Sequence, residues 1–164
     1  MNDFSAYAGG SRGDVTPGDF DWMLRTQIYG SFARSGRAPS LDDLAATIGA
    51  PPARVKGSLR RLTDSHEIAV TDDGEAVRMA HPFSAFPTAY PVETRDFTCY
   101  ANCAWDALAI PAVLRRDGWT STTCPASGEP LEFGIRNWNV EGDADAVIHF
   151  LTPLRHAWDD IGFT

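Results

Sequence analysis

The spacing of hydrophobic residues changes character at about residue 82. From residue 19 onward, apolar positions recur every three or four residues, and the pattern stops near Gly36; the positions are Trp22, Leu24, Ile28, Tyr29 and Phe32. This period is typical of an amphipathic helix, and a glycine commonly ends one. The sequence therefore predicts a helix that begins at about Asp19.

Two further helices are predicted from their end signals. Ser40 and Asp43 are spaced as in a capping box, and Gly49 follows the apolar residues of LDDLAATI. The prolines of PPARVKGSLRRLTDSH suit the first turn of the third helix, because the proline nitrogen has no hydrogen to leave unpaired there. After Glu67 the pattern alternates, and Asp-Asp-Gly within EIAVTDDGEAVRMA predicts a hairpin.

Three helices followed by a hairpin predict a winged helix-turn-helix-like unit at residues 19–82. Its third helix carries four basic residues that could contact DNA phosphates, namely Arg54, Lys56, Arg60 and Arg61. They could equally form a solvated face of a packing module. Between Arg34 and Arg78 there are seven basic and seven acidic residues, so no net positive charge favours DNA.

Downstream, the chain becomes proline-rich and then alternates between helix and strand patterns. Residues 83–98 are expected as an extended linker, and residues 99–164 as a second domain. In that domain CYANCAWDALAIPAVLRRDG predicts a helix that Pro111 kinks, WTSTTCPASGEPLEFGI a strand, a turn and a strand, and AVIHFLTP a buried strand. The predicted fold class is α+β, with the winged-helix-like unit packed on a domain of helices and antiparallel strands.

Composition and charge narrow the range of partners. The net charge of −8 disfavours broad binding to nucleic acid or to anionic membranes. No apolar run approaches the ~20 residues that a membrane span needs. Residues 1–18 lack a basic start followed by an apolar stretch, and their Gly/Ser/Asp content predicts a flexible segment rather than a secretory signal. We therefore expect a cytoplasmic protein whose three cysteines are thiols.

Two of these cysteines and an aspartate fall within eight residues. If residues 99–106 are helical, Cys99, Cys103 and Asp106 project from nearly one face. Two thiolates at this spacing could bind a soft metal such as Hg(II), Cu(I) or Zn(II), although a closed zinc site would also need His149 or His156. Alternatively, Cys99 is a small buried residue, which free cysteines commonly are.

The segment from Tyr100 to Ile135 resembles the organomercurial (alkylmercury) lyase family. The resemblance rests on YANCAWDALAIPAVL and STTCPASGEPLEF: an aromatic residue, a cysteine, an aspartate three residues later, an apolar run with proline, and a second cysteine about twenty residues on. It implies that Cys103 is the metal-binding nucleophile, Asp106 the proton carrier and Cys124 a structural thiol. It also implies an organomercurial substrate, a low-molecular-weight thiol as partner and no required cofactor.

One feature of the family pattern is not found in the sequence. Aligning AVIHFLTP with a strand of the family places the family's second catalytic cysteine at or just past Thr164, and a different alignment places Asp145 at that position. Both leave the expected thiol missing, and Cys99 could compensate only in part. We therefore expect binding of mercury through Cys103 with slow or absent cleavage of the carbon–mercury bond. Two other functions stay open: a protein of the same fold that binds a metal or small ligand without lyase turnover, and a winged-helix DNA-binding regulator that responds to a metal.

Overall fold

The computed structural model describes residues 16–150, 153, 156–159 and 161, and most of the predicted flexible segment at 1–18 lies outside them. Three helices open the described chain: α1 (Asp19–Ser35), α2 (Leu41–Ile48) and α3 (Pro52–Asp64). The end signals act as predicted. The Asp43 amide donates to Ser40 Oγ and the Ser40 amide to the Asp43 carboxylate, while Gly36 and Gly49 adopt left-handed φ values of 69°.

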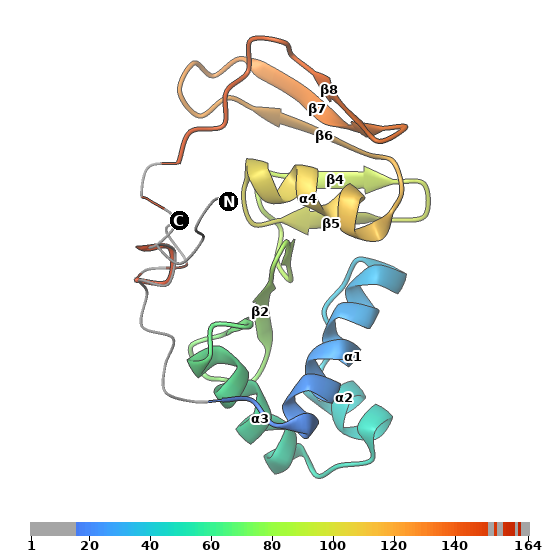
Figure 1. Cartoon of the computed structure of the whole chain (residues 1–164), viewed down its shortest axis with the longest axis vertical. Helices are drawn as coiled ribbons and strands as arrows, with labels where there is room; N and C mark the ends of the chain where they lie inside the picture. The colour runs from blue at the N-terminus through green and yellow to red at the C-terminus, as the bar shows by residue number, and fades with distance from the viewer. Residues whose placement is uncertain (1–15, 151–152, 154–155, 160, 162–164) are drawn as a thin grey trace, which may run out of the picture.

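A single antiparallel sheet follows the helices, with the strand order β1-β2-β3-β5-β4-β6-β7-β8. Its strands are β1 (Ala69–Val70), β2 (Val77–Ala80), β3 (Phe83–Ser84), β4 (Pro91–Thr94), β5 (Thr98–Ala101), β6 (Gly118–Thr123), β7 (Pro130–Arg136) and β8 (Asn139–Gly142). The predicted hairpins are present as β1–β2 and β6–β7. In Figure 1 the helices α1–α3 occupy the lower half, and α4 (Ala104–Leu114) lies across β4 and β5 in the upper half.

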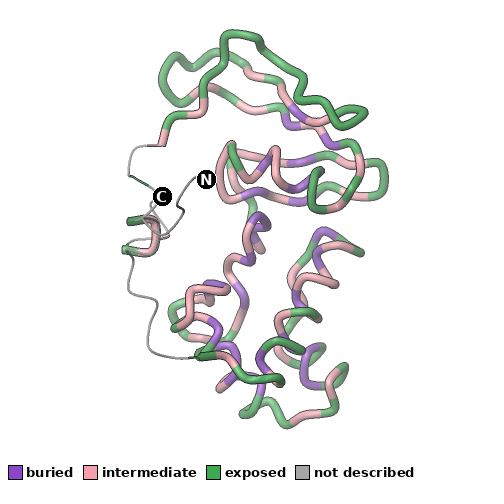
Figure 2. Tube along the Cα trace, in the orientation of Figure 1, coloured by how far each residue is buried: buried purple, intermediate pink, exposed green. Residues whose placement is uncertain are grey.

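The core joins the first helices to the sheet. Leu24, Ile28 and Phe32 of α1 are fully buried, and the ring of Phe32 stacks on Phe83 of β3 with 4.9 Å between centroids. Figure 2 shows that buried positions run through α1, α3 and the middle strands, whereas the outer hairpin is mostly exposed. All four residues of β8 are exposed. The structure is thus a mixed helix and antiparallel-sheet fold, and the winged-helix character of its first unit stays a prediction.

Three sequence-based expectations need correction. Residues 83–98 are not a linker, because β3 and β4 lie within them and pair with strands on both sides. Proline richness suggested a linker, but strands remote in the sequence supply the pairing partners. Residues 146–150 form no strand, and Val147 is 85% exposed, since this apolar run has no partner strand in the described part of the chain. The last residues of AVIHFLTP are only partly described.

The third correction concerns Cys99, which does not lie on a helix. Thr98–Ala101 forms strand β5, and the helix begins at Ala104. The pairing of β5 with both β3 and β4 overrides the helical spacing of Cys99 to Cys103 and Asp106. Pro111 lies inside α4, which continues to Leu114. No helix among the described residues is long and apolar enough to span a membrane.

Candidate active site

The turn between β5 and α4 carries the candidate nucleophile. Cys103 is the N-cap of α4, with extended backbone angles (φ −149°, ψ 179°), and its carbonyl accepts the Ala107 amide at 3.0 Å. The first amides of a helix have no partner within the helix and favour negative charge. The thiol is partly buried and makes no cap hydrogen bond. It nevertheless lies where a thiolate would face several unpaired amide groups.

Opposing effects act on the Cys103 thiol. Burial has the largest effect and raises the pKa of the thiol, and the charge of the Asp106 carboxylate also raises it. The backbone amides of Asp106 and Trp105 lower it. The net result is a raised pKa. The thiol is therefore mostly protonated at neutral pH. Formation of the nucleophile requires that its proton leave, and the Asp106 carboxylate lies close enough to raise the pKa of the thiol.

Asp106 lies in the first turn of α4, and its side chain is only 13% exposed. Two groups approach one of its oxygens, Oδ2: Asn102 Nδ2 donates to it at 3.0 Å, and His81 Nδ1 lies 3.5 Å away. Asn102 Nδ2 also lies 3.2 Å from the Pro82 carbonyl oxygen and 3.3 Å from His81 Nδ1. The peptide bond between His81 and Pro82 is cis.

Sequence analysis missed both of these neighbours of Asp106. Asn102 lies four residues before Asp106, a spacing that could have drawn attention to it. His81 is 25 residues upstream, and only the antiparallel pairing of β3 with β5 brings it to the site. No local sequence signal could have identified it.

Cys99 has different surroundings from Cys103. Cys99 is 1% exposed, lies opposite Val92 of β4, and directs its thiol at the Val92 carbonyl oxygen, 3.9 Å away. Its Cβ also packs against the end of α1, since a Cβ built on Gly36 would come within 3.0 Å of it. Burial raises the pKa of the Cys99 thiol to about 11. These observations favour the small buried residue over the metal ligand.

Cys124 follows β6 and is partly exposed. The Ser127 hydroxyl, followed by the amides of Ser127 and Ala126, lowers the pKa of its thiol. Burial raises the pKa of Tyr90, and the charges of Cys103 and Cys124 raise it further. A structural role for Cys124 stays a prediction.

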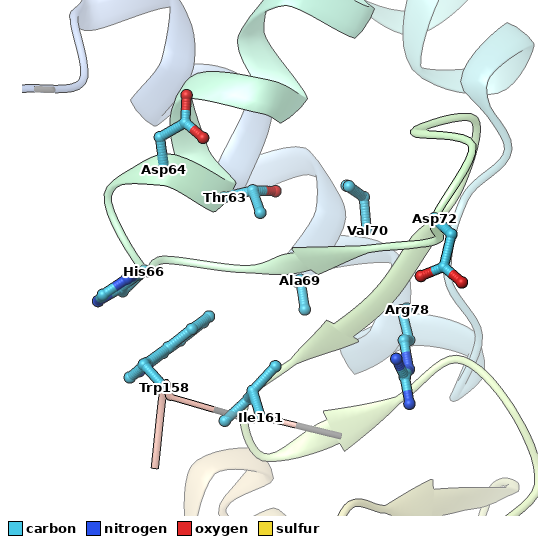
Figure 3. Close-up of a pocket in the computed structure, with 9 residues that line it drawn as sticks. All are labelled: Thr63, Asp64, His66, Ala69, Val70, Asp72, Arg78, Trp158 and Ile161. Carbon is cyan, nitrogen blue, oxygen red and sulfur yellow. The ribbon is translucent and has the colours of Figure 1, made fainter. Parts of the chain in front are cut away.

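Trp158 lies close to one residue of this site. Trp158 stacks on His66 with 4.5 Å between ring centroids and meets His81 edge-on at 6.0 Å. Figure 3 shows Trp158 and His66 at one end of a pocket of about 650 Å³, which also includes Ala69 and Arg78. Neither Cys103 nor Asp106 lines this pocket. Its connection to the candidate site is indirect, through the contact of Trp158 with His81.

The predicted DNA-contact residues are largely engaged within the protein. Arg54 stacks over Phe20 at 4.0 Å, Lys56 pairs with Glu75, and Arg61 pairs with Asp21 at 2.7 Å. Arg60 is exposed. DNA binding therefore gains no support from α3.

Among the described residues no three His, Cys, Asp or Glu side chains group as a metal site. His149, considered as a zinc ligand, is exposed, and His156 lies beside Asp159 at 3.0 Å.

Comparison with known proteins adds independent observations. The sequence profile of the alkylmercury lyase family (MerB) matches residues 83–164, which is half of the chain. Alkylmercury lyase of Bacillus cereus is 27% identical over 134 residues, which cover 80% of this chain and 58% of the relative. Alkylmercury lyase of Streptomyces lividans is 25% identical over 152 residues, covering 91% and 65% respectively.

The chain thus spans about 58% of the length of the Bacillus cereus relative. Among solved structures, the mercury-bound form of MerB2 matches with a TM-score of 0.64 and 22% identity, over 78% of this chain and 62% of that one. At this identity the match supports the fold. Cys103, Asp106 and Cys124 all lie within the range that the family profile matches.

Proposed function

The chain belongs to the alkylmercury lyase family, and from this premise we propose that it cleaves carbon–mercury bonds, with Cys103 as nucleophile and Asp106 as proton carrier. One observation carries the proposal: a thiol at the N-cap of α4 and a carboxylate in the first turn of the same helix, within the matched range. Mercury would be part of the substrate, and no cofactor is needed for the chemistry.

In the first step the sulfur of Cys103 binds the mercury of R–Hg–X, where X is a small ligand such as a thiolate. Mercury(II) is soft and prefers sulfur over nitrogen or oxygen donors. The new sulfur–mercury bond replaces the mercury–X bond, and X leaves with its electron pair. The thiol proton moves to the Asp106 carboxylate, which lies close enough to affect the thiol's pKa.

In the second step the carbon–mercury bond breaks. Its electron pair takes the proton held by Asp106, so the product is the hydrocarbon R–H and the carboxylate is restored. Mercury(II) stays on the Cys103 sulfur until a low-molecular-weight thiol displaces it. This step requires that a proton be delivered next to the metal. Cys103 and Asp106 are three residues apart, and side chains at this spacing are neighbours on a helix, so the acid lies beside the sulfur that holds mercury.

We further propose that turnover is slow where the Cys103 thiolate is the one sulfur bound to mercury. Electron donation to mercury from a second sulfur weakens the carbon–mercury bond, and the buried Cys99 thiol does not face Cys103. A barrier higher by a few kcal/mol slows the reaction on the order of a hundredfold or more. A small thiol in excess could supply the second sulfur.

The experiment is hydrocarbon release from a phenylmercury compound in excess small thiol. We expect Cys103→Ser to abolish benzene release and Asp106→Ala to slow it on the order of 100-fold or more. Cys99→Ser is the matched control and should release benzene at the wild-type rate. Wild-type turnover by Cys103→Ser would refute the assignment of the nucleophile. In a single turnover without added thiol, rapid benzene release by Cys99→Ser would refute the need for a second sulfur.

A further inference from the structure

The side-chain amide of Asn102 lies between Asp106 and the turn that precedes β3. Its nitrogen is 3.0 Å from Asp106 Oδ2, 3.2 Å from the Pro82 carbonyl oxygen and 3.3 Å from His81 Nδ1. Two of these neighbours, a carboxylate and a carbonyl, can only accept hydrogen bonds. The group that faces them must therefore be the NH₂ and not the oxygen, which fixes the orientation of the amide.

The hydrogen-bond count at this amide leaves one polar atom without a partner. The NH₂ group has two hydrogens, which the Pro82 carbonyl and the Asp106 carboxylate use. Asn102 Oδ1 is buried and accepts no hydrogen bond in the described part of the chain. An amide oxygen that is buried without a hydrogen-bond partner destabilises the fold. A hydrophobic residue at this position would avoid that cost. What the asparagine provides in return is the hydrogen bond that holds the Asp106 carboxylate.

We infer that Asn102 is the positioning residue of the site: it anchors the Asp106 carboxylate by Oδ2 to the backbone at Pro82 and leaves Oδ1 for proton transfer at Cys103. This inference rests on the proposed function and adds to it a residue that does not itself touch the substrate. Residue 102 also lies directly before the N-cap, on the turn that joins β5 to α4. The same turn thus determines the positions of both the Cys103 sulfur and the Asp106 carboxylate.

His81 is the third member of this cluster, and hydrogen-bond counting also limits its role. Because both hydrogens of the Asn102 amide are used elsewhere, Nδ1 of His81 faces Asp106 Oδ2 with its own N–H, at the long distance of 3.5 Å. The ring is 37% exposed and meets Trp158 edge-on. It completes the cluster on the same oxygen as Asn102, and does not compete for the other one.

The kinetic test compares Asn102→Asp, which keeps the shape but replaces the donor by an acceptor, with Asn102→Ala and the exposed control Asn139→Asp. With a phenylmercury substrate we expect kcat to fall about 10–100-fold in both Asn102 variants, with KM changed less than twofold. Asn139→Asp should behave as wild type. An equal loss in kcat for the control, or a change confined to KM, would overturn the inference.

A second measurement does not depend on turnover. The sequence contains four asparagines, so selective ¹⁵N labelling gives few side-chain amide signals, and Asn102→Asp identifies the pair from residue 102. We expect that pair to shift on Asp106→Ala while the Asn139 pair stays in place. If wild type releases no benzene but the shift is seen, the proposed function fails and the anchoring of Asp106 holds. If the pair does not respond to Asp106→Ala, the inference fails whatever the activity.

Discussion

Asp21 and Asp106 occupy the same position in two helices, the third residue after the N-cap of α1 and of α4. Every neighbour of Asp21 is a donor. The Gly18 amide lies at 2.9 Å, Arg61 donates through Nε at 3.0 Å and Nη2 at 2.7 Å, and the Ser58 hydroxyl completes the set. Arg61 is the main cause that lowers the pKa of Asp21 to about 2.

Asp106 has a different set of neighbours. An amide and an imidazole approach one of its oxygens, a thiol lies beside it, and no Lys or Arg ion pair involves it among the described residues. The difference teaches that helix position alone does not give an aspartate its role. A carboxylate paired with a guanidinium is held in its charged form and serves stability, whereas a neutral amide orients a carboxylate without adding a positive charge, which suits the role proposed for Asp106.

The largest expected contrast between the two aspartates is in stability. Asp21→Ala leaves the Arg61 guanidinium without its partner, and we expect the free energy of unfolding to fall by about 3 kcal/mol, the lower end of the range for a broken buried pair, since Arg61 is 44% exposed. Asp106→Ala should cost about 1 kcal/mol or less. Urea unfolding of both variants measures the contrast, and equal losses would contradict it.

A smaller effect is expected on acidification. The folded-state pKa of Asp21 is about 2, below its ordinary value of 3.8. Its stabilising contribution is therefore complete above about pH 5 and is lost as the pH falls through 3.8 toward 2; the loss is about 2 kcal/mol. The difference in unfolding free energy between wild type and Asp21→Ala should shrink by that amount between pH 5 and pH 2. A difference that stays constant over this range would show that the charge of Asp21 contributes nothing.

The smallest expected effect concerns the sulfur that does not share the site. Cys99→Ser places a hydroxyl where the thiol meets the Val92 carbonyl oxygen, so a donor is retained and the loss of stability should be about 1 kcal/mol. Binding of one Hg(II) per Cys103 should be unaffected in a titration followed by ultraviolet absorbance. A weaker affinity for Hg(II) in Cys99→Ser, with the affinity of Cys124→Ser unchanged, would show that Cys99 is a ligand of the metal.

The elements that could be predicted are those whose signals are local. A capping box at Ser40, prolines at the start of α3 and Asp-Asp-Gly in the first hairpin each act within a few residues, and the structure has these elements where the sequence placed them. Cys103 and Asp106 were singled out by a short motif and by its resemblance to the family, and their roles stay predictions. Such signals need no knowledge of the rest of the fold.

The failures share the opposite cause. The helical spacing of Cys99 to Cys103 predicts a helix, but the segment of Cys99 forms strand β5, which pairs with β3 and β4. The linker at 83–98 was misjudged for the same reason. His81 reaches Asp106 from 25 residues away through strand pairing. Contacts that depend on register between distant strands are not contained in any local pattern.

The central claim is that Asp106 protonates the carbon that leaves mercury on Cys103. The most direct measurement is the intact mass of protein mixed with one equivalent of a phenylmercury compound, in a Cys99→Ser, Cys124→Ser background that leaves one thiol. We predict that the adduct on Cys103 loses the phenyl group with time and retains mercury, and that Asp106→Asn keeps the phenylmercury adduct intact. Loss of the phenyl group at the same rate in Asp106→Asn would contradict the account.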